Sequence, residues 1–123
     1  MRSSVRSRLA PPNITVVPAA PTIATTPNPT STTVGNTLTD VAVLSGTYFP
    51  TGSITFTLSL NGTVVDTETV TVNGNGTYTT PTGFTVPLTG PGVYQWNAIY
   101  SGDSNNNAAS DIGDPKEQVV VSP

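Results

Sequence analysis

The fold of this chain is decided by the stretch Gly92-Val93-Tyr94-Gln95-Trp96-Asn97-Ala98-Ile99-Tyr100-Ser101-Gly102-Asp103. Its aromatic and small apolar residues alternate with largely polar ones, and the first group is Tyr94, Trp96, Ala98 and Tyr100. Because successive side chains of a β-strand point to opposite faces, the pattern predicts a strand with one face in an apolar core and the other in water. The stretch holds the only tryptophan and two of the four tyrosines, so we expect it to be the central strand of a β-sandwich.

The composition favours a single all-β domain without reactive side chains. A chain of 123 residues can bury one core without a covalent staple. It has no cysteine and no histidine, which excludes disulfides, thiol nucleophiles, and the commonest metal ligand and general base. Threonine favours strands, whereas glycine, proline and asparagine favour turns, and all four are abundant. We therefore expect an all-β protein that is not an enzyme and carries no cofactor.

A second central strand is predicted over residues 53–60, where apolar and hydroxyl side chains alternate. Asn61-Gly62 is a strong hairpin signal, and residues 63–72 return as a threonine- and valine-rich strand. Short strands with turns at regular spacing along the whole chain predict a Greek-key β-sandwich of about seven strands. Its two sheets are expected to bury Ile54, Phe56, Leu58, Tyr94, Trp96 and Ala98 against each other.

The strand expected over residues 37–44 has a less regular pattern. Leu38, Val41 and Val43 are candidate core residues, and their spacing is not strictly two. We therefore expect these three side chains in the core and a β-bulge near Asp40.

The chain divides into an extended N-terminal arm, residues 1–21, and a sandwich domain, residues 22–123. The arm carries Arg2, Arg6 and Arg8, a charge of +3. The rest of the chain carries one lysine and seven acids, a charge of −6, so the total is −3. A basic arm on an acidic body can dock on an acidic partner surface, including a neighbouring copy of the chain. A frayed terminus is the alternative.

The arm also contains a short β-type run, Ile14-Thr15-Val16-Val17-Pro18, which is similar to Val119-Val120-Val121-Ser122-Pro123. In a tandem array such a run can complete the sheet of a neighbouring copy, with Ile14, Val16 and Val17 as the contact residues. Valine-rich strands also look alike by chance. Both explanations remain open.

Three strings point to a family. They are Gly52-Ser53-Ile54-Thr55-Phe56-Thr57-Leu58, Gly74-Asn75-Gly76-Thr77-Tyr78-Thr79 and the central stretch with its continuation Tyr100-Ser101-Gly102-Asp103-Ser104-Asn105-Asn106. Over about residues 22–122 the chain resembles the bacterial Ig-like repeat domains of large surface proteins and of some phage structural proteins. The resemblance implies an Ig-like sandwich that serves as a spacer or adhesive stalk without catalysis. Gly92-x-Tyr94 also looks like a tyrosine corner, which would make Tyr94 structural.

Two groups of acids are candidate sites. Asp103, Asp111 and Asp114 lie in one asparagine-rich segment, and oxygen-rich loops can hold calcium. Their spacing matches no calcium motif, so we expect a solvated turn and keep the three as candidate ligands. Asp66 and Glu68 are two apart, as paired catalytic carboxylates can be, but the flanking threonines favour a plain solvent face.

Tyr48 and Phe49 form an aromatic loop tip. Such a tip can contact a sugar or a protein partner, or it can fold over the end of the core, which we favour. The acidic body would repel phosphates, so no nucleic-acid binding is expected. No apolar run is long enough for membrane insertion, and the first twelve residues lack the apolar stretch of a secretory signal.

The sequence thus predicts a non-enzymatic module that decorates or assembles a surface. The favoured setting is a phage capsid decoration protein on the virion surface, docked through its arm and part of a homo-oligomeric assembly. An extracellular bacterial fibre or adhesin subunit, joined by strand addition, is the first alternative. A carbohydrate-binding module that uses Tyr48 and Phe49 is the second.

Overall fold

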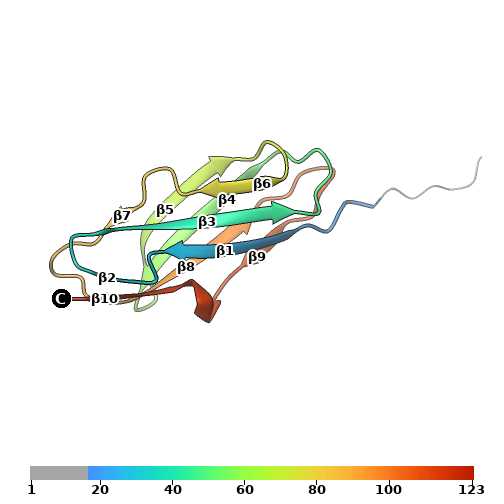
Figure 1. Ribbon diagram of the computed structural model, residues 1–123. Helices are drawn as coiled ribbons and strands as arrows, with labels where there is room; N and C mark the ends of the chain where they lie inside the picture. Colours follow the sequence, from blue (N-terminus) through green and yellow to red (C-terminus); the bar gives the residue numbers. More distant parts are fainter. Residues whose placement is uncertain (1–16) are drawn as a thin grey trace, which may run out of the picture.

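The computed structural model describes residues 17–123, which form two β-sheets packed face to face (Figure 1). Five residues expected to bind a partner, namely Arg2, Arg6, Arg8, Ile14 and Val16, lie outside this part of the chain. The described residues contain no α-helix, and their one helical element is the 3-10 turn η2 (Pro115–Glu117). The prediction of an all-β Ig-like sandwich is therefore confirmed.

The smaller sheet contains β1 (Thr22–Asn28), β3 (Thr37–Ser45), β6 (Gly76–Thr79) and β7 (Phe84–Thr85). Strand β3 is its centre and pairs antiparallel with the other three. Strand β3 begins at residue 37, as predicted, and β1 includes Pro27 next to its last residue, Asn28. Proline is tolerated there because β1 is an edge strand.

The larger sheet runs in the order β2 (Ser31–Thr33), β10 (Gln118–Ser122), β8 (Gly92–Tyr100), β4 (Ser53–Leu60) and β5 (Thr63–Thr71), with β9 (Ala109–Asp111) beside β8. All its neighbours are antiparallel except β2 and β10. The central position of β8 and β4 agrees with the prediction from the sequence. The short strands β2 and β9 were not predicted.

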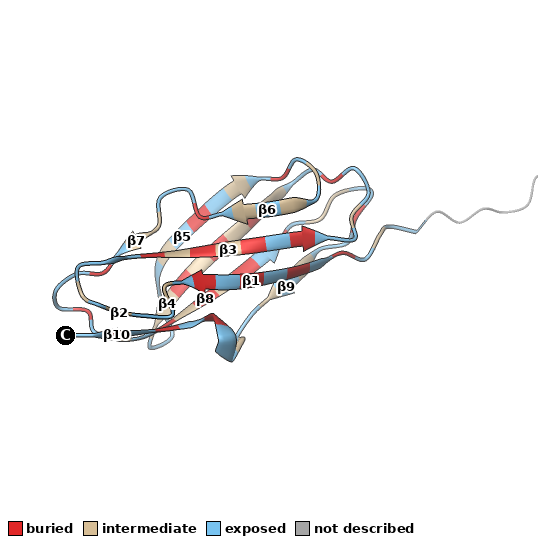
Figure 2. Ribbon diagram, in the orientation of Figure 1, coloured by how far each residue is buried: buried red, intermediate tan, exposed pale blue. Residues whose placement is uncertain are grey.

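The six side chains expected in the core, Ile54, Phe56, Leu58, Tyr94, Trp96 and Ala98, are all fully buried. They come from β4 and β8, which pair so that Leu58 lies opposite Trp96 and Phe56 opposite Ala98. Buried residues alternate with half-buried or exposed ones along these strands, as Figure 2 shows. At about 1.5–3 kcal/mol for each large buried side chain, this layer supplies much of the stability.

The prediction for the strand around Asp40 is confirmed for Leu38, which is fully buried, but it is wrong for Val41, Val43 and the bulge. Strand β3 alternates without a bulge, and its inward side chains are Leu38, Asp40, Ala42 and Leu44. Val43 points outward and is exposed. The two leucines lie an even number of residues apart and fix the register, which carries Asp40 inward although it is the most polar residue of the strand. The register irregularity lies instead between Leu58 and Ser59, where β4 pairs with β5.

Tyr94 forms the corner that its position suggested. Its hydroxyl donates a hydrogen bond of 2.7 Å to the backbone carbonyl of Gly90, four residues upstream. Both residues are buried. A Cβ at position 90 would come within 2.8 Å of this hydroxyl, so the close approach requires glycine. The bond fastens the loop before β8 to the core strand itself.

The substitution Tyr94→Phe removes this hydrogen bond and leaves the Gly90 carbonyl buried without its partner. We expect it to lower the free energy of unfolding by about 1–2 kcal/mol, measured by urea denaturation with tryptophan fluorescence. Tyr48→Phe removes a hydroxyl from an exposed ring and is the matched control, with an expected change near zero. Equal unfolding midpoints for the two variants would contradict a structural role for the corner.

Candidate functional site

One end of the sandwich gathers the features that the sequence marked as contact residues. The chain joins the domain there through Val17, whose side chain is 72% exposed. The backbone of Ala19 then pairs with the loop before β9, donating to the Asn105 carbonyl and accepting from the Asn107 N–H, each at 2.8 Å. We call this end the N-terminal pole and define it by residues 17–19, 48–51 and 103–107. The C-terminus lies at the opposite end (Figure 1).

A buried asparagine connects the two loops of the N-terminal pole. Asn106 is only 2% exposed, and its Oδ1 accepts a 2.8 Å hydrogen bond from the backbone N–H of Tyr48. Its Nδ2 donates to the Tyr48 carbonyl at 3.0 Å and to Asp103 at 2.9 Å. One side chain thus binds both backbone groups of Tyr48. The side chain of Asn106, which is distant in sequence, therefore holds the backbone of the aromatic loop in place.

Asp103 is the second connection, and its carboxylate is surrounded by donors. It accepts from the Thr51 N–H at 2.6 Å, the Tyr100 hydroxyl at 3.1 Å and the Asn105 N–H at 2.7 Å. These bonds, that from Thr51 above all, hold the pKa of the carboxyl well below its usual range. An acid used in this way has a structural role, and Asp103 does not belong to the carboxylate group that contains Asp111 and Asp114.

The aromatic tip is exposed, contrary to the favoured expectation that it folds over the core. Tyr48 is 62% and Phe49 75% exposed, and their rings meet edge to face with centroids 4.7 Å apart. Phe49 has a φ of 42°, in the left-handed region that is costly for a bulky residue. The bonds from Asn106 and Asp103 to the flanking backbone hold the loop in this conformation.

A second candidate site lies at the rim between the sheets, beside β9 and η2. Asp111, Asp114 and Glu117 each place one carboxylate oxygen within 4.8 Å of the others. Asp40 comes from the smaller sheet and faces Glu117. We call these four residues the acid cluster. The sequence analysis proposed two of them as ligands and missed Asp40 and Glu117. Each of these two lies an even number of residues from inward-facing apolar neighbours, a spacing that predicts an inward side chain.

Thr25 of β1 binds three members of the acid cluster. Its N–H donates to Asp111 at 3.2 Å, and its hydroxyl donates to Glu117 and also interacts with Asp40. Burial, then the neighbouring charge of Glu117, raises the pKa of Asp40 to about 8. Burial likewise raises the pKa of Glu117. Asp40 Oδ2 has no hydrogen-bond partner.

A further acidic pair closes the rim at β5. Asp66 and Glu68 point toward the interior side of the larger sheet, so the expected solvent face is a wrong prediction. Glu68 accepts from the backbone N–H groups of Thr82 at 2.8 Å and Gly83 at 3.1 Å. Burial raises the pKa of Asp66 to about 6. The pair links the larger sheet to the loop between β6 and β7.

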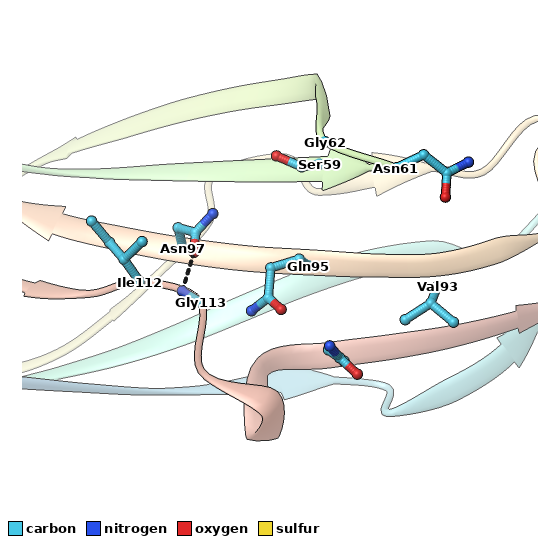
Figure 3. A pocket seen from close by; sticks show the side chains of 9 residues that line it. Ser59, Asn61, Gly62, Val93, Gln95, Asn97, Ile112 and Gly113 are labelled. Atoms are coloured by element: carbon cyan, nitrogen blue, oxygen red, sulfur yellow. Dashed lines mark hydrogen bonds between the residues drawn. The ribbon is translucent and has the colours of Figure 1, made fainter.

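The outer face of the larger sheet carries a shallow groove of about 400 Å³ beside β8 (Figure 3). Its side chains come from β4, β8, β10 and the segment after β9, and they include Gln95, Asn97 and Ile112. The two amides are engaged with the protein: Asn97 accepts from the Gly113 N–H at 2.8 Å, and Gln95 donates to the Asp114 carbonyl at 2.9 Å. The groove wall therefore positions the loop of the acid cluster from outside.

Among residues 17–123, no helix is long and apolar enough to span a membrane.

Comparisons with known proteins agree with this architecture. The sequence pattern described as "Bacterial Ig-like domain (group 3)" matches residues 25–120. No curated protein matches the chain. The CARDB domain of the PF1109 protein from Pyrococcus furiosus, solved in complex with di-metal ions, shares the fold at 19% identity with a TM-score of 0.51, covering 89% of this chain and 93% of its own. BslA, a bacterial hydrophobin, aligns at 17% identity with a TM-score of 0.39, over 89% of this chain and 98% of its own.

The carboxylate of Asp103 provides a pH test of the N-terminal pole. Its folded pKa is lower than that of the unfolded chain, so the ionised form stabilises the fold above about pH 4. This contribution is lost as the pH falls further. We expect Asp103→Asn to have a lower urea midpoint than the native chain at pH 7, and the difference to narrow below about pH 4. A difference that stays constant down to pH 2.5 would show that the ionised carboxylate is not what holds the pole.

Proposed function

Because the chain belongs to the family of bacterial Ig-like domains (group 3), we propose that it is a non-catalytic module that docks on a protein surface by its N-terminal pole. Domains of this family are generally non-catalytic and commonly occur in extracellular or surface proteins. The surface that we propose is the shell of a virion. This chain would then decorate the particle in many copies.

The observation that carries the proposal is the meeting of three exposed apolar side chains at one pole. Val17, Tyr48 and Phe49 all lie where the N-terminal segment joins the domain. Exposed aromatic anchors on a fixed backbone are typical of binding hot spots, since little conformational entropy is lost when they are covered. Asn106 and Asp103 provide that fixed backbone.

The distribution of charge along the chain also supports docking by the N-terminal pole. The arginines of the arm precede the pole in sequence, whereas all seven acids belong to the domain. A shell surface with acidic patches would attract the arm and repel most of the domain. Electrostatic attraction of this kind accelerates encounter and orients the partners, while the apolar anchors at the pole slow dissociation.

The elongated shape fits a module that stands on its support. With the N-terminal pole docked, the opposite end and the C-terminus face away from the shell (Figure 1). The same placement of the two ends favours a second function, in which copies follow one another in an extracellular fibre and residues 14–18 complete the sheet of the next copy. A carbohydrate-binding role is less well supported, because rings that meet at 84° offer a sugar no flat platform.

The double substitution Tyr48→Ala and Phe49→Ala tests the docking pole. We expect it to weaken co-sedimentation of the full chain with virions of the source by at least about tenfold, because two central aromatic anchors are lost. Leu88→Ala is the matched control, since Leu88 is 78% exposed and lies in the loop between β7 and β8. Its binding should equal that of the native chain.

Three further measurements distinguish the virion, fibre and carbohydrate-binding functions. Deletion of residues 1–12 should abolish binding to virions while leaving the urea midpoint unchanged. Binding to host cells but not to virions would favour the fibre or adhesin. Binding to isolated glycans that is lost in the aromatic variant would favour the carbohydrate module. Equal virion binding by all variants would overturn the proposed docking.

A further inference from the structure

The acid cluster is held rigidly by groups outside it. Asp114 caps the η2 turn, accepting from the Lys116 N–H at 2.9 Å through its side chain and from the Glu117 N–H at 2.9 Å through its carbonyl. Gln95 and Asn97 bind the same segment from β8, at the Asp114 carbonyl and the Gly113 N–H. The backbone that carries Asp114 and Glu117 is therefore fixed by the η2 cap and by the two amides of β8.

The separation of their oxygens suits a large divalent cation. One oxygen each from Asp111, Asp114 and Glu117 lies within 4.8 Å of the other two. Calcium binds oxygen at about 2.3–2.6 Å, so ligands on opposite sides of one ion are about 5 Å apart. Carboxylates that bind in mono- or bidentate fashion, together with water, can provide the six to eight oxygens that calcium takes.

An independent observation comes from the smaller sheet. Asp40 is fully buried, and its Oδ2 has no hydrogen-bond partner. Its carboxyl faces that of Glu117. A buried oxygen without a partner costs about 1–3 kcal/mol unless something binds it. Glu117, which the Asp40 carboxyl faces, is one of the three residues whose carboxylates converge.

The protein supplies little positive charge for this group. Within residues 17–123 the one lysine or arginine is Lys116, and its side chain is exposed. We propose that the acid cluster is a calcium-binding site, in which Asp111, Asp114 and Glu117 bind the ion and Asp40 completes the site from the smaller sheet. The ion would join β3 of the smaller sheet to β9 and η2 beside the larger one, at a rim that no disulfide closes.

Calcium binding is tested by stability and by calorimetry on the full chain after treatment with EDTA. At pH 7.5, calcium chloride should raise the urea midpoint in a saturable manner, whereas sodium chloride of equal ionic strength should not. Calcium at 100 times its dissociation constant raises the folding equilibrium constant about 100-fold. Isothermal titration should give one calcium ion per chain.

Conservative variants keep the test independent of folding. Asp111→Asn and Asp114→Asn retain acceptors for Thr25 and for the η2 cap while removing two charges, so the double variant should fold and lose the calcium-dependent shift. Asp66→Asn, within β5, removes a carboxylate outside the cluster. It should keep the shift in full.

Several results would overturn the proposal. These are no calcium-dependent shift in the native chain, an undiminished shift in the double variant, or loss of the shift in Asp66→Asn. Magnesium binding that is as tight as calcium binding would overturn the assignment of the ion, because magnesium requires shorter bonds of about 2.0–2.1 Å.

Discussion

Two β-sheets that share one apolar core still need their rims and ends closed, and in this chain carboxylates and amides close them. Six of the seven acids accept hydrogen bonds from the protein itself: Asp40, Glu68, Asp103, Asp111, Asp114 and Glu117. Only 9% of the residues are charged, so few acids are left to form an ordinary solvated surface. The charged residues of the domain are mainly parts of its framework.

This constraint explains why the N-terminal pole suits a contact role. Asn106 and Asp103 bind the loop of Tyr48 at backbone positions, so its side chains stay free while its main chain is fixed. The most specific string of the family resemblance, residues 100–106, supplies both residues and also Tyr100, whose hydroxyl donates to the Thr51 carbonyl at 2.8 Å. Residues 100–106 therefore hold the loop of Tyr48 in place, whichever surface the N-terminal pole contacts.

The sequence alone was sufficient for the layers of the fold. Alternation in β4 and β8 identified both central strands and the side chains between the sheets, because period two is a direct consequence of strand geometry. It failed for β3, because Val41 and Val43 are apolar yet lie on the outward face, opposite to the register set by Leu38 and Leu44. The three-residue strands β2 and β9 carry too few residues to show a period.

The candidate sites were harder to predict from the sequence than the fold was. Glu117 shares its parity with Val119 and Val121, which indicates its inward direction, but nothing local indicates that Asp40 comes to meet it from the other sheet. The bonds between Asn106 and Tyr48 join residues 58 positions apart. Contacts of this kind depend on how the sheets stack, and a single sequence contains no local pattern for them.

The aromatic loop is rigid although it has no regular secondary structure. Amide hydrogen exchange at Tyr48 tests it most directly, because this N–H donates to the buried Oδ1 of Asn106. If the bonds from Asn106 and Asp103 keep the loop closed, the Tyr48 amide exchanges as slowly as amides within β4 and β8. Exchange in the loop and in the strands then requires the same sub-global opening. Exchange at the rate of an unstructured peptide would contradict the claim, because the loop would then open freely and present no fixed surface.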